Sequence, residues 1–224
     1  MNDNQDLKDN TVSSHGQTRN QFVTYGGAEN ALVRVLFVGN SITRHVVLPM
    51  IGWYRDCGMA ASSIEKDYVH IVVSELERRY GAVRFCIAQL AEWERNYGSN
   101  EIMESYSEAR DFNADIVVIR IGENIHCNKD DESELTDAFE RMVRFLAAKK
   151  GCKIIFTDLF WSSRIINSAL NEACNRVGGT MVSIGDLGED ATMKALGEYE
   201  HKGVSLHPND NGMRHIAMRI LEKC

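Results

Sequence analysis

Five short runs of β-branched and aliphatic residues, separated by longer amphipathic segments, constrain the fold of this chain more than any other feature. The runs lie at residues 33–38, 83–87, 116–119, 153–156 and 181–184. Such runs are typical of buried strands, and the segments between them have the apolar spacing of helices. Strands that alternate with helices form parallel βαβ units. The sequence therefore predicts an α/β protein with a single three-layer α/β/α domain and a five-stranded, mainly parallel sheet.

The segments between the runs carry helix signals of their own. We expect helices at about residues 62–76, 101–111, 132–149, 163–177 and 210–221. The first begins with Ser62-Ser63-Ile64-Glu65, which has the spacing of a capping box. In the usual flavodoxin-like order the third strand lies next to the first, and ligands bind beyond the carboxyl ends of the strands. The residues just after each run are therefore the candidates for function.

Composition and charge exclude several classes of protein. The chain has 224 residues, of which 44% are hydrophobic and 25% are charged. These ordinary globular values exclude collagen, coiled coils and wholesale disorder. The 25 Lys and Arg residues against 32 Asp and Glu residues give a net charge of −7. We therefore expect neither nucleic acid nor a membrane surface as a partner, and the sequence does not indicate an oligomeric state.

The N-terminal segment differs from the rest of the chain. Residues 1–21 are polar and have no periodic apolar face, so we expect a flexible tail followed by one domain over residues 22–224. No apolar stretch is long enough to span a bilayer, and the N-terminus lacks the apolar region of a signal peptide. The sequence as it stands predicts a cytoplasmic protein, or a secreted or periplasmic one if a signal peptide has been trimmed. The six cysteines form no C-x-x-C pair and are expected to be reduced.

Three polar groups follow predicted strands or precede the last helix. Ser41, in Gly39-Asn40-Ser41, puts a hydroxyl at a sharp turn after the first run, and Asn124 follows the third run. His207 precedes the last helix and has a side chain whose ordinary pKa suits a general base. Each has a structural alternative: a helix N-cap for Ser41, a loop cap for Asn124 and a buried structural histidine for His207. Their combination at one edge of the sheet favours a catalytic role.

The blocks around these residues resemble those of a known family, the SGNH or GDSL-like hydrolases. Gly39-Asn40-Ser41 is similar to the first block, with Asn in place of the usual Asp. Gly122-Glu123-Asn124 is similar to the Gly-x-Asn block, and His207-Pro208-Asn209 is similar to the last block. The likeness spans about residues 33–224. More narrowly, residues 51–53, 58–62 and 67–70 resemble a bacterial branch that is grouped with carbohydrate esterases.

The resemblance implies a serine esterase or deacetylase that hydrolyses a small acyl ester. The substrate that we expect is an O-acetyl group on a carbohydrate. Ser41 would be the nucleophile that forms an acyl-enzyme, and His207 would be its base. The oxyanion hole would consist of the Asn124 amide and the backbone N–H groups of Ser41 and Ala91. No cofactor and no metal is implied, because no histidines stand at metal-ligand spacing.

Two positions depart from the family pattern. The family has Gly in the loop after the second strand, where this chain has Ala91, and it has Asp three residues before the histidine, where this chain has Val204. A backbone carbonyl near Val204 or Ser205 would leave a Ser-His dyad, which we favour. Otherwise a carboxylate must come from elsewhere, and the nominees are Glu200, Asp158, Asp210, Glu94 and Glu123. Of these, Asp210 is expected to cap the last helix instead.

A few further residues are candidates for contact with the substrate. They are Trp93, Glu94 and Trp161, and Trp53 joins the two other tryptophans as a potential sugar-stacking surface. Packing in the core is the structural alternative for each tryptophan. The departures at Ala91 and Val204 also motivate a second hypothesis, a non-catalytic module of this fold that binds a carbohydrate or acyl ligand. A nucleotide-binding protein is excluded, because neither G-x-G-x-x-G nor a P-loop motif occurs.

Overall fold

The computed structural model describes residues 22–99 and 101–224, so the predicted tail at residues 1–21 lies outside the described residues. A six-stranded sheet has the order β1-β3-β2-β4-β5-β6. The strands are β1 (Val23–Gly27), β2 (Val33–Gly39), β3 (Val83–Gln89), β4 (Ile116–Arg120), β5 (Lys153–Thr157) and β6 (Thr180–Val182). β2 to β6 pair in parallel, and β1 pairs antiparallel with β3 at the edge. The mainly parallel sheet is confirmed, with β1 added to the five predicted strands.

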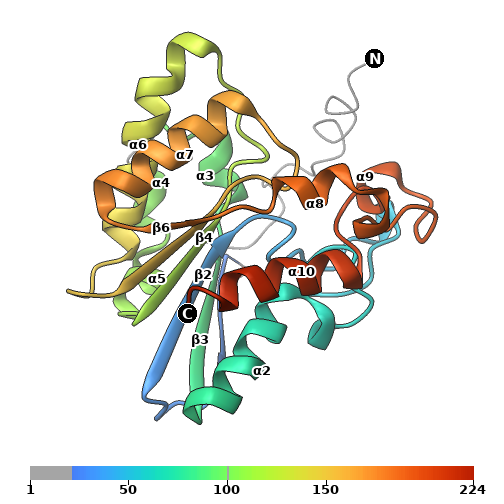
Figure 1. The fold of residues 1–224 in the computed structure, drawn as a ribbon, viewed down its shortest axis with the longest axis horizontal. Helices are drawn as coiled ribbons and strands as arrows, with labels where there is room; N and C mark the ends of the chain where they lie inside the picture. The colour runs from blue at the N-terminus through green and yellow to red at the C-terminus, as the bar shows by residue number, and fades with distance from the viewer. Residues whose placement is uncertain (1–21, 100) are drawn as a thin grey trace.

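Helices cover both faces of the sheet and form the outer layers (Figure 1). One face carries α2 (Tyr68–Tyr80) and α10 (Asp210–Leu221), and the other carries α5 (Ser107–Asp111), α6 (Glu132–Leu146) and α7 (Arg164–Val177). The shorter helices are α3 (Ala91–Arg95), α4 (Glu101–Glu104), α8 (Gly185–Glu189) and α9 (Lys202–Ser205). Single 3₁₀ turns occur at η3 (Pro49–Ile51), η4 (Ile64–Lys66), η5 (Lys129–Asp131) and η6 (Ala191–Met193). No helix in the described part of the chain is long and apolar enough to cross a membrane.

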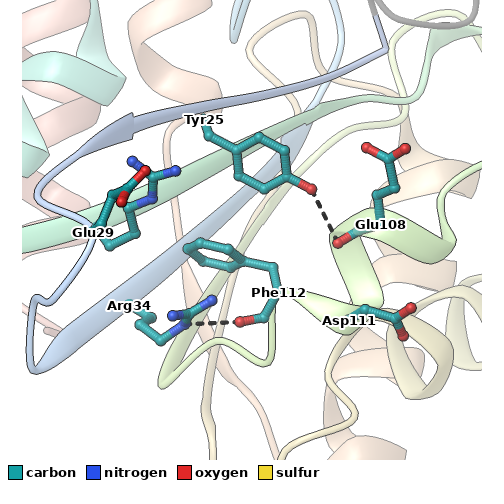
Figure 2. A pocket seen from close by; sticks show the side chains of 7 residues that line it. Tyr25, Glu29, Arg34, Glu108, Asp111 and Phe112 are labelled. Carbon is teal, nitrogen blue, oxygen red and sulfur yellow. Dashed lines mark hydrogen bonds between the residues drawn. The ribbon is translucent and has the colours of Figure 1, made fainter.

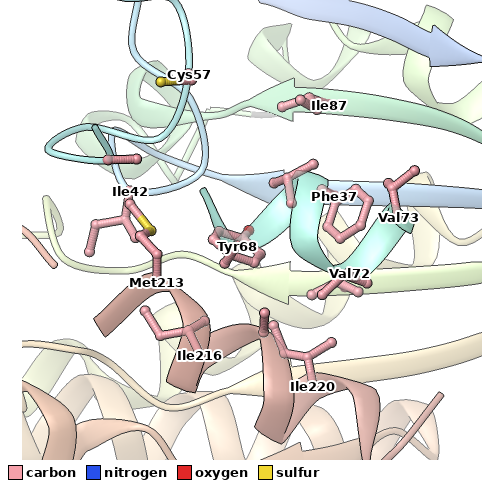
Figure 3. Close-up of a cluster of buried hydrophobic side chains, with 14 of the residues drawn as sticks. Phe37, Ile42, Cys57, Tyr68, Val72, Val73, Ile87, Met213, Ile216 and Ile220 are labelled. Carbon is pink, nitrogen blue, oxygen red and sulfur yellow. The ribbon is translucent and has the colours of Figure 1, made fainter. Parts of the chain in front are cut away.

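The central strands are buried on both faces, which explains why they read as continuous apolar runs. Successive side chains of β2 point to opposite faces, so Val35 and Phe37 pack toward α2 and α10 while Leu36 and Val38 pack toward α6 and α7. Figure 3 shows Phe37 between the strands and the apolar faces of α2 and α10. The sheet is therefore held rigidly between two cores, and its carboxyl edge is a firm support for a site.

One helix start and one N-cap differ from the sequence predictions. The predicted capping box at residues 62–65 does not start a continuous helix, because α2 begins at Tyr68 with Asp67 as its N-cap. Asp67 accepts from the backbone N–H of His70 and also from that of Gly58, so its carboxylate ties the helix start to the preceding loop. The N-cap of α10 is Asn209 and not Asp210. The Asp210 carboxylate instead accepts from Ser62 and Lys66, which draws it away from the capping position.

The predicted helix at residues 101–111 is two short helices, α4 and α5, that are separated by Ser105 and Tyr106. Tyr106 is buried, and its hydroxyl donates to the carbonyl of Gln89 at the end of β3. The break therefore lets an aromatic side chain reach under the carboxyl edge of the sheet.

Candidate active site

Ser41 lies just beyond the carboxyl end of β2, in a turn that is held by hydrogen bonds and close packing of the adjacent residues. The N–H groups of Thr43 and Arg44 both donate to the carbonyl of Asn40, at 2.9 and 3.0 Å, so the chain turns sharply after Asn40. A Cβ at Gly39 would lie 1.8 Å from Thr43 Oγ1, which no larger residue could tolerate. This turn presents the Ser41 hydroxyl at the edge of the sheet, 2.9 Å from Nε2 of His207.

His207 is held by a backbone carbonyl in the protonation state that a general base requires. Its Nδ1 lies 2.7 Å from the carbonyl oxygen of Gly203 in α9. A carbonyl oxygen can only accept, so Nδ1 carries the ring proton and Nε2 of the neutral imidazole is left to accept from the Ser41 hydroxyl. In a catalytic triad an aspartate fixes the same tautomer. The Gly203 carbonyl therefore supplies the orientation, but it brings no negative charge.

The surroundings of His207 keep its ring neutral. Its side chain is buried, and burial lowers the pKa of His207 from 6.5 to about 3, more strongly than the Gly203 carbonyl raises it. The positive charge of Arg120 acts in the same direction as burial. The ring of Trp161 meets the imidazole edge to face, with centroids 5.0 Å apart. The imidazole is thus unprotonated over the whole physiological range.

The carboxylates nominated as a third catalytic group bind elsewhere. Sequence reasoning named a carbonyl near Val204 or Ser205, and the carbonyl on His207 Nδ1 is that of Gly203, one residue earlier. Glu200 is an exposed surface residue. The four other nominees accept from other groups: Asp158 from Ser183 and Ile184, Asp210 from Ser62 and Lys66, Glu123 from Asn40 and Phe160, and Glu94 from Asn124 and Asn40.

The predicted oxyanion donors start from neighbouring strand ends. Gly39 of β2 is in register with Gln89 of β3 and with Arg120 of β4, so the loops that carry Ser41, Ala91 and Asn124 begin side by side. The Asn124 side chain is partly exposed, and its Nδ2 donates one N–H to Glu94. The backbone N–H of Ala91 already has an acceptor, the side-chain oxygen of Gln89 at 3.3 Å. In this structure Asn124 is therefore better placed than Ala91 to serve an oxyanion.

The residues expected to contact substrate separate into two groups. Trp161 is partly exposed beside His207, so a bound ligand could reach it. Trp93 is only 1% exposed and packs against Phe139, and Trp53 is wholly buried with its indole N–H on the carbonyl of His45. Glu94 is also wholly buried. The expectation that Trp93 and Glu94 contact substrate is therefore wrong, because side chains on the inner face of α3 turn into the protein.

Sequence reasoning missed a buried polar cluster under the loops that carry Ser41 and Asn124. It consists of Asn40, Glu94, Arg120 and Glu123, and we call it the buried cluster. Asn40 Nδ2 lies 3.0 Å from Glu94 and 2.7 Å from Glu123, and its Oδ1 accepts from Arg120 at 3.0 Å. Arg120 also pairs with Glu123 at 2.5 Å. The available signal was Arg120 itself, a lone charge that ends the apolar run Ile116–Arg120.

The burial of neutral His207 predicts a specific loss of stability in acid. The unfolded state takes up a proton below about pH 6.5, whereas the folded state does so only near pH 3. The unfolded state thus binds more protons in this window, so the free energy of unfolding falls as the pH falls. Between about pH 7.5 and pH 5 we expect the wild type to lose about 2 kcal/mol more than His207→Gln. Urea unfolding of both proteins at each pH measures this, and parallel losses would contradict it.

The pocket in Figure 2 is lined by residues at the amino ends of β2 and β3, whereas Ser41 follows the carboxyl end of β2. It has a volume of about 450 Å³ and is lined by Tyr25, Glu29, Arg34, Arg84, Glu108, Asp111 and Phe112. Arg34 is near the amino end of β2, and its Nε donates to the carbonyl of Phe112. The Tyr25 hydroxyl donates to the carbonyl of Glu108. These hydrogen bonds hold β1 and β2 against α5 and its C-cap Phe112.

Within the described residues no group of three or more His, Cys, Asp or Glu could hold a metal ion.

Comparison with known proteins adds evidence on the fold. No protein-family model matches the sequence, and no curated protein matches it. A family two carbohydrate esterase from Cellvibrio japonicus superposes with a TM-score of 0.55 at 13% identity, over 85% of this chain and 60% of that one. A protein described as a GDSL-like lipase from Bacteroides ovatus superposes with a TM-score of 0.50 at 13% identity, over 85% of this chain and 97% of that one. Such similarity shows the fold: the chain has the three-layer α/β/α fold of these two proteins, as the sequence predicted.

Proposed function

We propose that the protein is a serine esterase that hydrolyses small acyl esters. The observation that carries this proposal is the contact between the Ser41 hydroxyl and Nε2 of a His207 whose Nδ1 is held by a carbonyl. Only this tautomer can take the hydroxyl proton while the oxygen attacks an acyl carbon. The fold shared with a carbohydrate esterase and a GDSL-like lipase supports the same reaction class.

In the first half of the reaction, Ser41 Oγ bonds to the carbonyl carbon and its proton passes to His207 Nε2. The tetrahedral oxyanion accepts hydrogen bonds from the free N–H of the Asn124 amide and from the backbone N–H of Ser41. The C–O bond to the alcohol then breaks, and the imidazolium returns the proton to the leaving oxygen. Water repeats these steps on the acyl-enzyme, which releases the acid and restores Ser41.

The pair works as a dyad in this proposal, with the Gly203 carbonyl in place of the usual aspartate. The carbonyl dipole orients the ring, but it stabilises the transient imidazolium less than a carboxylate would. The pKa of His207 stays low because burial lowers it more than the Gly203 carbonyl raises it. We therefore expect a modest rate, which is sufficient for a substrate that is presented in a well-fitted pocket.

We propose an O-acetyl group on a carbohydrate as the substrate. A pocket of about 580 Å³ lies between residues 49–54, which follow Ser41, and residues 198–201, which precede His207. Tyr54 and Tyr199 offer aromatic faces, and Glu198 and Glu200 offer acceptors for hydroxyl groups. His201 also lines the pocket, and it is the N-cap of α9, the helix that carries Gly203. This position suits the sugar that leaves after acyl transfer.

Acetate release from an acetylated xylo-oligosaccharide, compared with p-nitrophenyl acetate and p-nitrophenyl octanoate, tests the proposal. We expect the wild type to cleave both acetyl esters, and to cleave the octanoyl ester far more slowly. Tyr54→Ala should raise KM for the oligosaccharide by about tenfold while leaving p-nitrophenyl acetate unaffected, because only the sugar reaches Tyr54. Tyr80→Ala, a change to an exposed tyrosine at the end of α2 that does not line this pocket, is the matched control.

The alternative is a module that binds a carbohydrate or acyl ligand without turnover. The departures at Ala91 and Val204 motivated it, but the Ser41–His207 contact favours catalysis, because a binding module needs no activated hydroxyl. Saturable binding of the acetylated oligosaccharide without acetate release would favour the module. Equal release by the wild type and Ser41→Ala would reject the esterase.

A further inference from the structure

We propose that Glu94 is a positioning residue that holds the oxyanion amide of Asn124 in place. This inference rests on the proposed esterase function and goes beyond it, because Glu94 touches neither Ser41 nor His207. Its carboxylate is wholly buried behind the site. Through it, the loop that carries the nucleophile and the loop that carries the oxyanion donor share one acceptor.

The two oxygens of Glu94 have separate partners. Oε2 accepts from Asn124 Nδ2 at 2.5 Å. Oε1 accepts from the backbone N–H of Gly122 at 2.7 Å and from Asn40 Nδ2 at 3.0 Å, with the backbone N–H of Asn124 at 3.3 Å. Asn40 directly precedes Ser41, and Gly122 begins the Asn124 loop. Oε1 therefore links the side chain of Asn40 to the backbone of the loop that carries Asn124, and Oε2 fixes the side chain of Asn124.

The geometry of an amide explains why Oε2 matters for catalysis. Asn124 Nδ2 has two N–H groups in one plane. When one of them is tied to Glu94, the rotation of the amide is set, and the other N–H points in a fixed direction from a partly exposed side chain. An oxyanion hole depends on donors that are already aimed before charge develops. Without Glu94, the amide could rotate and donate to water or to neighbouring carbonyls.

The local backbone limits how Asn124 can be held by other means. Gly122 has φ of +136°, and a Cβ there would lie 2.8 Å from Leu159 Cδ2. The loop thus leaves β4 in a conformation that only glycine adopts readily, and its next anchor is the Glu94 carboxylate. Burial and the negative charge of Glu123 raise the pKa of Glu94, so its charged form is disfavoured at this position. The hydrogen bonds that the carboxylate accepts act in the opposite direction and stabilise the charged form.

Glu94→Gln separates the two oxygens. The oxygen of the introduced glutamine must occupy the Oε1 position, where three N–H groups converge, so its NH₂ group then faces the NH₂ group of Asn124. The backbone anchor is kept, but the hydrogen bond to Asn124 is replaced by a contact between two donors. We expect kcat to fall by about 10- to 100-fold with KM changed less than about threefold, as is typical when a supporting hydrogen bond is lost.

A double-mutant cycle shows whether Glu94 acts through Asn124. We expect Asn124→Ala to lower kcat by about 100-fold or more. In that background Glu94→Gln should have little further effect, because the group that it orients is gone. Multiplicative losses would overturn the inference, since they would mean that Glu94 supports activity by another route.

The double variant Glu94→Gln/Asn124→Asp guards against a simple folding defect. The amide of the introduced glutamine can donate to the carboxylate of the introduced aspartate, so the urea midpoint should recover toward that of the wild type. The kcat should stay low, because the aspartate side chain has no N–H to offer to an oxyanion. Recovery of kcat together with stability would assign Glu94 a purely structural role.

The two proposals fail in different ways. An active wild type and an inactive Ser41→Ala, combined with a Glu94→Gln that keeps the wild-type kcat, would overturn this inference alone. A wild type that hydrolyses no ester would overturn the proposed function and, with it, the catalytic role of Glu94. The side-chain amide signals of Asn124 in ¹⁵N–¹H spectra give a readout other than activity. We expect a strong shift of one proton that is lost in Glu94→Gln, and an unchanged pair of signals would contradict the contact.

Discussion

Replacing Ser41 with alanine is expected to lower kcat for ester hydrolysis by about 10⁴-fold or more, because only the oxyanion donors and substrate binding then remain. His207→Ala should have an effect of similar size, since an unactivated hydroxyl is a poor nucleophile. The double variant should be no slower than either single variant, because the pair acts as a unit. Initial rates of acetate release by the three variants and the wild type measure this.

Two controls test whether these losses are specific. Ser205 is a buried serine in α9 whose hydroxyl donates to the carbonyl of Lys202, and His45 is a second histidine near the site whose Nδ1 lies against the carbonyl of Val46. Ser205→Ala and His45→Ala should stay within about threefold of the wild-type rate, because neither side chain takes part in proton transfer. A Ser41→Ala protein that keeps more than about a tenth of the wild-type rate would contradict the assignment of the nucleophile.

Removing Arg120 is expected to cause the largest loss of stability. Its side chain is wholly buried, and Glu123, its partner at 2.5 Å, is only 3% exposed. Breaking a buried pair leaves an uncompensated charge, so Arg120→Met should lower the free energy of unfolding by about 3–5 kcal/mol. Urea denaturation followed by circular dichroism measures the change.

Arg176→Met is the matched control for Arg120→Met. Arg176 pairs with Asp137 and Glu172 on the surface and is 37% exposed, so its removal should lower the free energy of unfolding far less than Arg120→Met does. Replacing both Arg120 and Glu123 with apolar residues should recover part of the loss, because Glu123 is then no longer left as a buried charge without its partner. Equal losses from Arg120→Met and Arg176→Met would mean that the buried cluster does not hold the two loops together.

The sequence predicted β2 to β5 because these strands are largely buried and so appear as apolar runs. It also predicted β6 from the run at residues 181–184, although β6 covers Thr180–Val182 and its first residue is exposed. It did not predict β1, since Val23–Gly27 has two glycines among its five residues and its pairing depends on β3, which lies far along the chain. The bounds of α10 were predicted as observed, but its N-cap was misplaced by one residue. Asn209 and Asp210 are both good N-caps by type, and the choice between them is made by Lys66 and Ser62 on a distant part of the chain.

The site was predictable where side-chain chemistry carries it and not where the backbone does. Ser41, Asn124 and His207 stand out by type and by their position after strands or before a helix. The Gly203 carbonyl has no such signal, because every residue has a carbonyl and only the fold of α9 aims this one at His207. Glu94 was taken for a substrate contact or a catalytic carboxylate because helix α3 is too short for its inner face to be recognised from apolar spacing. Its contact with Asn124 arises only when β3 and β4 flank β2.

Intact mass after treatment with a fluorophosphonate probe tests the central claim most directly, because the probe bonds only to a serine whose hydroxyl a base has activated. The account predicts one adduct on the wild type, mapped to the peptide that contains Ser41, and none on folded Ser41→Ala or His207→Ala. An unlabelled wild type, or equal labelling of Ser41→Ala, would contradict the claim that Ser41 and His207 form a working catalytic pair.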